Sequence, residues 1–370
     1  IDAYNEANGT HYLARGYYAY NTDPATGSQV RSDGKYHVFN NQIPMSWDEL
    51  RECARIFTKE FNTSSDSRYG FMNEWWFSYG WSVGGDCLEF VSDPNDDGDT
   101  SDGQYMFSLG EKTPNYLVTG SAAVTVNGNT YNAGDILSYD DKHYVEDHKS
   151  DAAIAEYLAG EQLYELPSIY DAFLEFCRLS QTTNRDVTTG VKGYGISPSP
   201  TTLNQKGKNL YFTSGETAML CQSLESVYTI GRSMSSEWDV APLYQYREYD
   251  ETTGALKTVN GTEIKGKKSA HNQSNGYAIP ANSQKKAAAW KFINYLMSAE
   301  AQAQLIDSNA VPCRISVANS DAYKNYDKNY APKNKAALVD AAGYCTVGDW
   351  SYVEDGEWIN GWANILNTKV

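Results

Sequence analysis

The chain has 370 residues and a formal net charge of −17 at pH 7. This length suffices for two domains, and 41% hydrophobic with 21% charged residues predicts a folded globular protein. The acidic balance argues against nucleic acid and against an anionic membrane face as partners, because both need a basic surface.

Tyrosine and tryptophan are unusually frequent, with 29 Tyr and 9 Trp against 11 Phe. Both side chains combine a flat apolar face with a polar edge, which suits ligands of mixed character such as sugars. The alternative is that these rings fill a large core. None of the six cysteines lies in a CxxC pair or a His/Cys cluster, so no zinc site is expected. Cys53 and Cys177 fall in helical patterns and are predicted to be buried thiols, and disulfide pairing stays open.

The first elements expected are a strand within residues 13–21 and a helix that begins after Ser46. Ser46 and Glu49 have the spacing of a capping box, in which each side chain accepts from the other residue's backbone N–H. The helix face that is predicted to be buried consists of Trp47, Leu50, Ala54 and Phe57.

Residues 69–90 are dense in aromatic side chains and contain few charges. Trp76, Tyr79 and Trp81 are candidates for lining a concave site, and an aromatic helix packed in a core is the alternative. Glu74 and Asp86 lie within this stretch, so a paired-carboxylate glycosidase stays open as a hypothesis.

An acidic loop follows, and its first half matches the D-x-N-x-D-G pattern of a calcium loop. Gln104 stands where that pattern needs a bidentate glutamate. We therefore expect an acidic surface loop, with calcium as the alternative. The candidate ligands are Asp93, Asn95, Asp97 and Asp99.

Residues 118–139 alternate in polarity and turn at Asn127-Gly128, which predicts a β-hairpin within a small β-rich insertion. A helix is predicted after Ser168, with Asp171 in its first turn. A C-terminal helix is predicted from the spacing of Trp358, Trp362, Ile365 and Leu366.

Residues 274–312 have the pattern of an α/β unit: a short apolar strand, a turn and two helices. Ser283 is the predicted N-cap of the first helix, and Ser298 caps a second helix over residues 299–305. The face that carries Trp290 is predicted to pack against a sheet.

The usual catalytic signatures are absent from the sequence: there is no GxSxG, HExxH, Walker A or GxGxxG. No apolar run approaches membrane-spanning length. The five histidines show no partner spacing.

Seven motifs occur in a specific order along nearly the whole chain: YN (20–21), PMSWDELRECARIFT (44–58), YGF (69–71), FTSGETAML (212–220), WDVAPL (238–243), NGYAIPANSQKKAAAWKFINYLMSAEAQ (275–302) and VP (311–312). This order resembles the extracellular solute-binding proteins of ABC importers, in particular the maltose-binding-like sugar-binding family.

The resemblance implies a periplasmic-binding-protein-like fold with two α/β lobes joined by a hinge. Lobe 1 would comprise residues 1–16 and 239–311, and lobe 2 residues 17–238 and 312–370. The family has further strand–helix units before residue 20, so lobe 1 is expected to be incomplete and both chain ends truncated. The Trp290 segment should then be the least natively buried part of the chain.

The resemblance places a sugar-contacting aromatic at the start of a helix, where Trp76 is the best match, and another in the C-terminal helix. Residues 222–225 depart from the family, which has an aromatic residue there. Together with the aromatic stretch, the predicted ligand-binding residues are Glu74, Trp75, Trp76, Tyr79, Ser274, Asn275, Trp358 and Trp362.

We therefore expect a monomeric, non-enzymatic protein without a cofactor. It is expected to capture a carbohydrate, specifically an oligosaccharide, and to deliver it to permease subunits. The family implies a place outside the cytoplasmic membrane, as a lipoprotein or in the periplasm. Two alternatives stay open: a glycoside hydrolase or lyase with an aromatic cleft, and a surface carbohydrate-binding adhesin.

Overall fold

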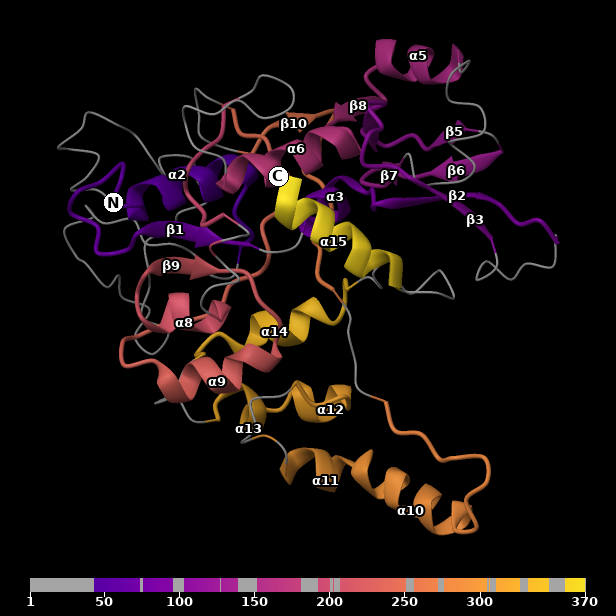
Figure 1. The fold of residues 1–370 in the computed structure, drawn as a ribbon. Helices are drawn as coiled ribbons and strands as arrows, with labels where there is room; N and C mark the ends of the chain where they lie inside the picture. The colour runs from indigo at the N-terminus through magenta and orange to yellow at the C-terminus, as the bar shows by residue number, and fades with distance from the viewer. Residues whose placement is uncertain are drawn as a thin grey trace.

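The structure is a computed structural model that mixes helices with short strands (Figure 1). The residues that it describes are 43–73, 76–95, 103–126, 128–138, 152–180, 192–199, 202, 207–250, 256–271, 276–304, 306, 311–326, 332–345 and 357–369. The strand expected within residues 13–21 lies outside these ranges.

The helices of the described residues are α2 (Trp47–Phe57), α3 (Phe77–Val83), α5 (Ala152–Ala159), α6 (Ile169–Ser180), α8 (Lys208–Thr213), α9 (Glu225–Ser233), α10 (Lys286–Leu296), α11 (Ala299–Gln304), α12 (Ile315–Ala318), α13 (Asp321–Lys324), α14 (Lys335–Ala341) and α15 (Glu357–Lys369). The strands are β1 (Tyr69–Met72), β2 (Leu88–Ser92), β3 (Gln104–Phe107), β4 (Asn115–Val118), β5 (Val124–Val126), β6 (Asn129–Tyr131), β7 (Ile136–Leu137), β8 (Leu163–Leu166), β9 (Thr217–Leu220), β10 (Thr258–Val259) and β11 (Thr262–Glu263).

A parallel strand pair joins two distant parts of the chain. β1 pairs with β9 in a parallel register that sets Phe71 opposite Met219. Helix α2 lies on β1 so closely that a Cβ at Gly70 would stand 1.8 Å from the Ala54 carbonyl oxygen. Only glycine fits there, and this contact between helix and strand is the α/β part of the fold.

The antiparallel part is larger than the small insertion predicted from the sequence. β2 pairs with β3, β4 lies between β7 and β8, and β5 pairs with β6. The predicted hairpin is confirmed, because Val126 pairs with Asn129 across a two-residue turn that includes Gly128. All four residues of β4 are buried, as expected for a central strand.

The predicted helix caps are confirmed at three of four positions. Ser46 and Glu49 form both hydrogen bonds of the capping box, Ser168 accepts from the Asp171 N–H, and the Ser298 hydroxyl accepts from the Ala301 N–H. The prediction for Ser283 is wrong, because α10 begins at Lys286 and has Lys285 as its N-cap. The Ser283 hydroxyl instead accepts from the Lys285 N–H in the preceding turn.

Helices α10 and α11 project from the rest of the molecule (Figure 1). No residue of α10 is buried, and Trp290 and Phe292 are 59% and 61% exposed. The expectation of poor burial for the segment that carries Trp290 is therefore confirmed. In the described part of the chain, no sheet covers that face.

The segment between α9 and α10 packs against α3 and the antiparallel strands. Tyr244 lies 4.5 Å from Tyr79 between ring centroids, and Ile264 is fully buried with Leu117 and Leu166. The division predicted from the sequence placed this segment with the other lobe. In the structure, Tyr244, Tyr246 and Tyr249 share a core with Tyr79 and Val83 of α3.

The side chains of all six cysteines are free thiols, and Cys53 and Cys177 are buried as predicted. The exposed Cys313 thiol lies 3.7 Å from the Met297 sulfur. Within the described ranges, no helix is both long and apolar enough to cross a membrane.

The buried Glu49 predicts an unusual pH dependence of stability. Burial raises its pKa to about 8, although Ser46, Arg247 and Tyr249 favour the carboxylate. Because the pKa of Glu49 is higher in the folded than in the unfolded chain, protonation of Glu49 stabilises the fold. This contribution is complete below the unfolded-state pKa and is lost as the pH rises through about 8. We expect the free energy of unfolding to fall from pH 5 to pH 8.5, by up to about 4 kcal/mol.

Urea unfolding of the Glu49→Gln variant checks this expectation. Glutamine keeps the capping box but carries no charge, so the pH dependence should flatten. The exposed Glu60→Gln variant is the matched control and should keep the wild-type slope. An unchanged slope in Glu49→Gln would assign the pH dependence to other groups.

Candidate functional site

Helix α3 is the element around which the candidate site is built. All seven of its residues are buried, including Ser78 and Ser82. A helix without a polar face must be enclosed by other elements on every side. It ends at Gly84, whose φ of 93° is the left-handed conformation that glycine adopts at helix ends.

One side of α3 faces the core that is formed with α2. Tyr79 lies 5.2 Å from Trp47, edge to face, and burial raises its pKa well above the usual value. Asn73 donates to the Tyr244 hydroxyl at 2.6 Å in the same core. The structure therefore places Tyr79 among core residues, apart from the other predicted ligand-binding aromatics.

The other side of α3 carries an aromatic cluster whose members come from four elements or their flanking residues. Trp76 precedes α3, and its ring lies 6.3 Å from that of Trp362 in α15, edge to face. Phe107 of β3 stacks on Trp362 at 5.3 Å and meets Trp358 edge to face at 5.7 Å. Phe173 of α6 lies 6.5 Å from Trp362. We call Trp76, Phe107, Phe173, Trp358 and Trp362 the aromatic cluster.

Three of the predicted ligand-binding residues therefore come together: Trp76, Trp358 and Trp362. The sequence did not single out Phe107 or Phe173 for the site. Phe173 lies in the helix predicted after Ser168. Phe107 gave no sequence signal, because its position depends on the pairing of β3 with β2.

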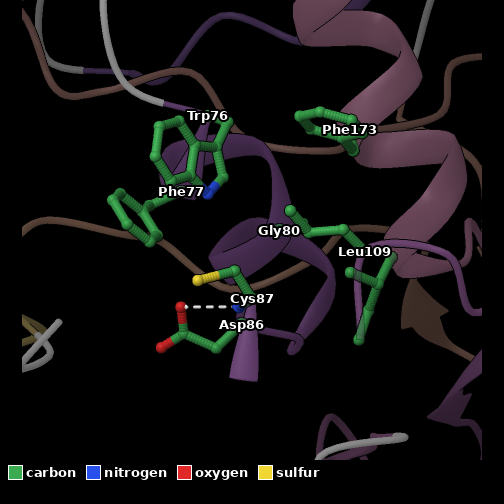
Figure 2. A pocket seen from close by; sticks show the side chains of 8 residues that line it. Trp76, Phe77, Gly80, Asp86, Cys87, Leu109 and Phe173 are labelled. Carbon is green, nitrogen blue, oxygen red and sulfur yellow. Dashed lines mark hydrogen bonds between the residues drawn. The ribbon is translucent and has the colours of Figure 1, made fainter. Parts of the chain in front are cut away.

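A small hollow of about 10 Å³, room for about one water molecule, lies beside the cluster. Figure 2 shows Trp76 and Phe77 on one side of it and Phe173 and Leu109 on the other. Asp86 is the one carboxylate in its lining, and an oxygen of this group accepts from the Cys87 N–H at 3.0 Å. The hollow does not by itself enclose a sugar ring, and what its lining offers is one carboxylate among apolar side chains.

Indole N–H groups add donors to this region. Within the described residues, the Nε1 atoms of Trp81, Trp358 and Trp362 are buried without a hydrogen-bond acceptor. Buried donors are usually paired, so these groups favour a ligand that carries oxygen acceptors over a hydrocarbon. Trp81 also stacks on His271 at 5.7 Å, and burial lowers the pKa of His271, which favours its neutral form.

Several predicted site residues lie outside the described ranges: Glu74, Trp75, Ser274, Asn275, Asp97 and Asp99. Of the candidate calcium ligands, Asp93 and Asn95 are described, and Asp93 accepts from the Asn95 N–H at 3.0 Å. The described residues contain no group of three side chains suited to a metal ion. A calcium site at this loop stays a prediction.

Comparison with protein families matches residues 179–331 to a bacterial extracellular solute-binding protein family. This confirms the family resemblance, since the matched segment carries the FTSGETAML, WDVAPL and NGYAIP motifs. The aromatic cluster lies outside it. No curated protein matches the chain.

Among solved structures, an ABC substrate-binding protein of Listeria monocytogenes, in complex with cycloalternan, matches with 14% sequence identity and a TM-score of 0.43. The match covers 90% of this chain and 61% of that chain. The present chain thus spans less than two thirds of the length of that protein.

The cluster should hold α15 in place, since Trp358, Ile359 and Trp362 are its residues packed on the core. We expect Trp362→Ala to speed amide hydrogen exchange over residues 357–369 about fivefold, because it removes ring contacts worth about 1 kcal/mol in total. Ile365→Ala is the control: this residue of the same helix is 53% exposed, and its removal should leave exchange unchanged. Equal exchange in both variants would show that the cluster does not anchor α15.

Proposed function

We propose that this chain, whose residues 179–331 match a bacterial extracellular solute-binding protein family, captures a carbohydrate for an ABC importer. The observation that carries the proposal is the aromatic cluster. It unites Trp76 with Trp358 and Trp362 from the far end of the chain, beside a hollow that contains a carboxylate.

The chemistry of the cluster suits a sugar. Aromatic faces pack on the C–H faces of pyranose rings, while a few placed polar groups bind the hydroxyls. Asp86 supplies an acceptor and the indole N–H groups supply donors. Binding of this kind needs no activated nucleophile, so the proposal is a binding protein and not an enzyme.

The proposal includes two lobes with the ligand between them and a hinge that closes on binding. In the division predicted from the sequence, lobe 1 comprises residues 1–16 and 239–311. The packing of residues 244–266 on α3 favours a later start for the second part of lobe 1, after residue 266. The small separate core around Ile306, Val317 and Tyr323 supports a distinct unit in this part of the chain.

The proposed partners and location follow from the family. The protein would deliver its ligand to permease subunits as a monomer, outside the cytoplasmic membrane, anchored by a lipid or free in the periplasm. Glu74, Trp75, Ser274 and Asn275 remain proposed ligand contacts.

A glycoside hydrolase is the competing function, and Asp86 in the lining of the hollow is the observation that favours it. That enzyme would need a second carboxylate, for which Glu74 was the candidate. The two functions differ in outcome: a hydrolase releases products from an oligosaccharide, and a binding protein does not. A surface adhesin would bind sugar but no permease.

Calorimetry against a panel of sugars, followed by product analysis, tests the proposal. We expect binding without product formation, and Trp76→Ala should weaken it by more than about 1 kcal/mol through loss of an aromatic contact. Trp76→Phe preserves a ring in this 4% exposed position and separates binding from folding. Trp290→Ala, on the exposed face of α10, is the matched control and should bind normally.

Absence of heat with every sugar, or normal affinity in Trp76→Ala, would contradict the proposal. Product formation that is lost in Asp86→Asn would replace it with the hydrolase.

A further inference from the structure

We infer that Cys313 and Met297 together form a two-sulfur site for a soft monovalent metal ion of the copper(I) or silver(I) class. Met297 is the C-cap of α10, and Cys313 directly precedes Arg314, the N-cap of α12. The site lies outside the aromatic cluster, and its metal binding does not depend on the proposed carbohydrate function.

The two sulfur atoms are close enough to share one ion. The thiol sulfur of Cys313 lies 3.7 Å from the thioether sulfur of Met297. With metal–sulfur bonds of about 2.3 Å, as in zinc thiolate sites, this separation gives a sulfur–metal–sulfur angle of about 110°. That angle is close to the tetrahedral value, so both sulfur atoms can bind one ion without moving apart or together.

The chemistry of the two donors selects the metal. Thiolate and thioether are soft ligands, which favour copper(I) over hard cations such as Mg²⁺ and Ca²⁺. Zn²⁺ takes four ligands, mostly from Cys, His, Asp and Glu, and the described part of the chain contains no group of three such residues. Copper(I) and silver(I) accept low coordination numbers, so the sulfur pair and a solvent ligand suffice.

One buried glutamine holds the backbones of both sulfur-bearing segments. Gln302 of α11 is 5% exposed. Its amide oxygen accepts from the Cys313 N–H at 3.0 Å, and its amide nitrogen donates to the carbonyl of Leu296, next to Met297, at 2.8 Å. Arg314 donates from Nε to the Met297 carbonyl. Contacts of this kind, behind the ligands, orient them and raise metal affinity.

The site is open to an incoming ion. Cys313 is exposed and Met297 is half-buried, whereas the thiols of Cys53, Cys87 and Cys177 are buried. The thiolate is the form of cysteine that binds metals, so the Cys313 thiol releases its proton when the ion enters. Affinity for the ion therefore rises with pH until the thiol is ionised in the free protein.

Anaerobic titration of the whole chain with copper(I), in competition with a chromophoric copper(I) chelator, tests the inference. We expect the wild type to bind a copper(I) ion that Cys313→Ser does not bind. Met297→Leu nearly preserves the side-chain volume but removes the sulfur, and it should weaken binding at least tenfold. Cys345→Ser removes another partly exposed thiol and is the matched control, which should bind as the wild type does.

NMR of the methionine methyl groups, with silver(I) as a redox-stable probe, provides a second readout. We expect silver(I) to shift the Met297 methyl resonance in the wild type and not in Cys313→Ser. The resonance is assigned by its loss in Met297→Leu.

Three outcomes would overturn the inference: no copper(I) binding by the wild type, wild-type affinity in Met297→Leu, or an unshifted Met297 methyl resonance. The contact between the two sulfur atoms would then be only a hydrogen bond from thiol to thioether. Sugar binding is measured separately, so these results leave the proposed carbohydrate function untouched.

Discussion

The enclosure of α3 is the constraint on which the described structure depends. A seven-residue helix with no polar face cannot lie at a surface, and burying each of its large side chains contributes about 1.5–3 kcal/mol. Distant segments close around it: Gln245 donates to the Met45 carbonyl, and the Ser82 carbonyl accepts from the Lys267 N–H at 2.7 Å. Gly266 is required beside it, because a Cβ there would lie 1.9 Å from the Ser82 carbonyl oxygen.

This enclosure also explains why the candidate site is composite. The two sides of α3 have different roles, since Tyr79 completes a core and Trp76 begins the aromatic cluster. Because α3 is held from both sides, Trp76 is placed firmly before any ligand arrives, which favours binding. The rest of the cluster comes from β3, α6 and α15, so no single segment contains the site.

Helix α10 shows the opposite situation. It has an apolar face like α2, yet all of its residues are half-buried or exposed. Its neighbours α11 to α14 pack mainly with one another around Val317 and Tyr323. The same local pattern of side chains therefore leads to burial in one helix and exposure in the other, because only the partner surface differs.

The sequence by itself determined the local features: the capping box at Ser46, the hairpin at Gly128, the C-terminal helix and the aromatic character of residues 69–90. It also indicated the resemblance to the family whose members match residues 179–331, through motifs in that segment. These features depend on neighbouring residues, or on motif order, and are visible without the fold.

Tertiary structure alone decided which aromatic residues meet. It separated Tyr79 from Trp76, although they are three positions apart, and it added Phe107 and Phe173 to Trp358 and Trp362. The physical reason is that a fully buried helix has no sequence signal for its two sides. Strand pairing and the docking of α15, which act across hundreds of residues, choose what each side contacts.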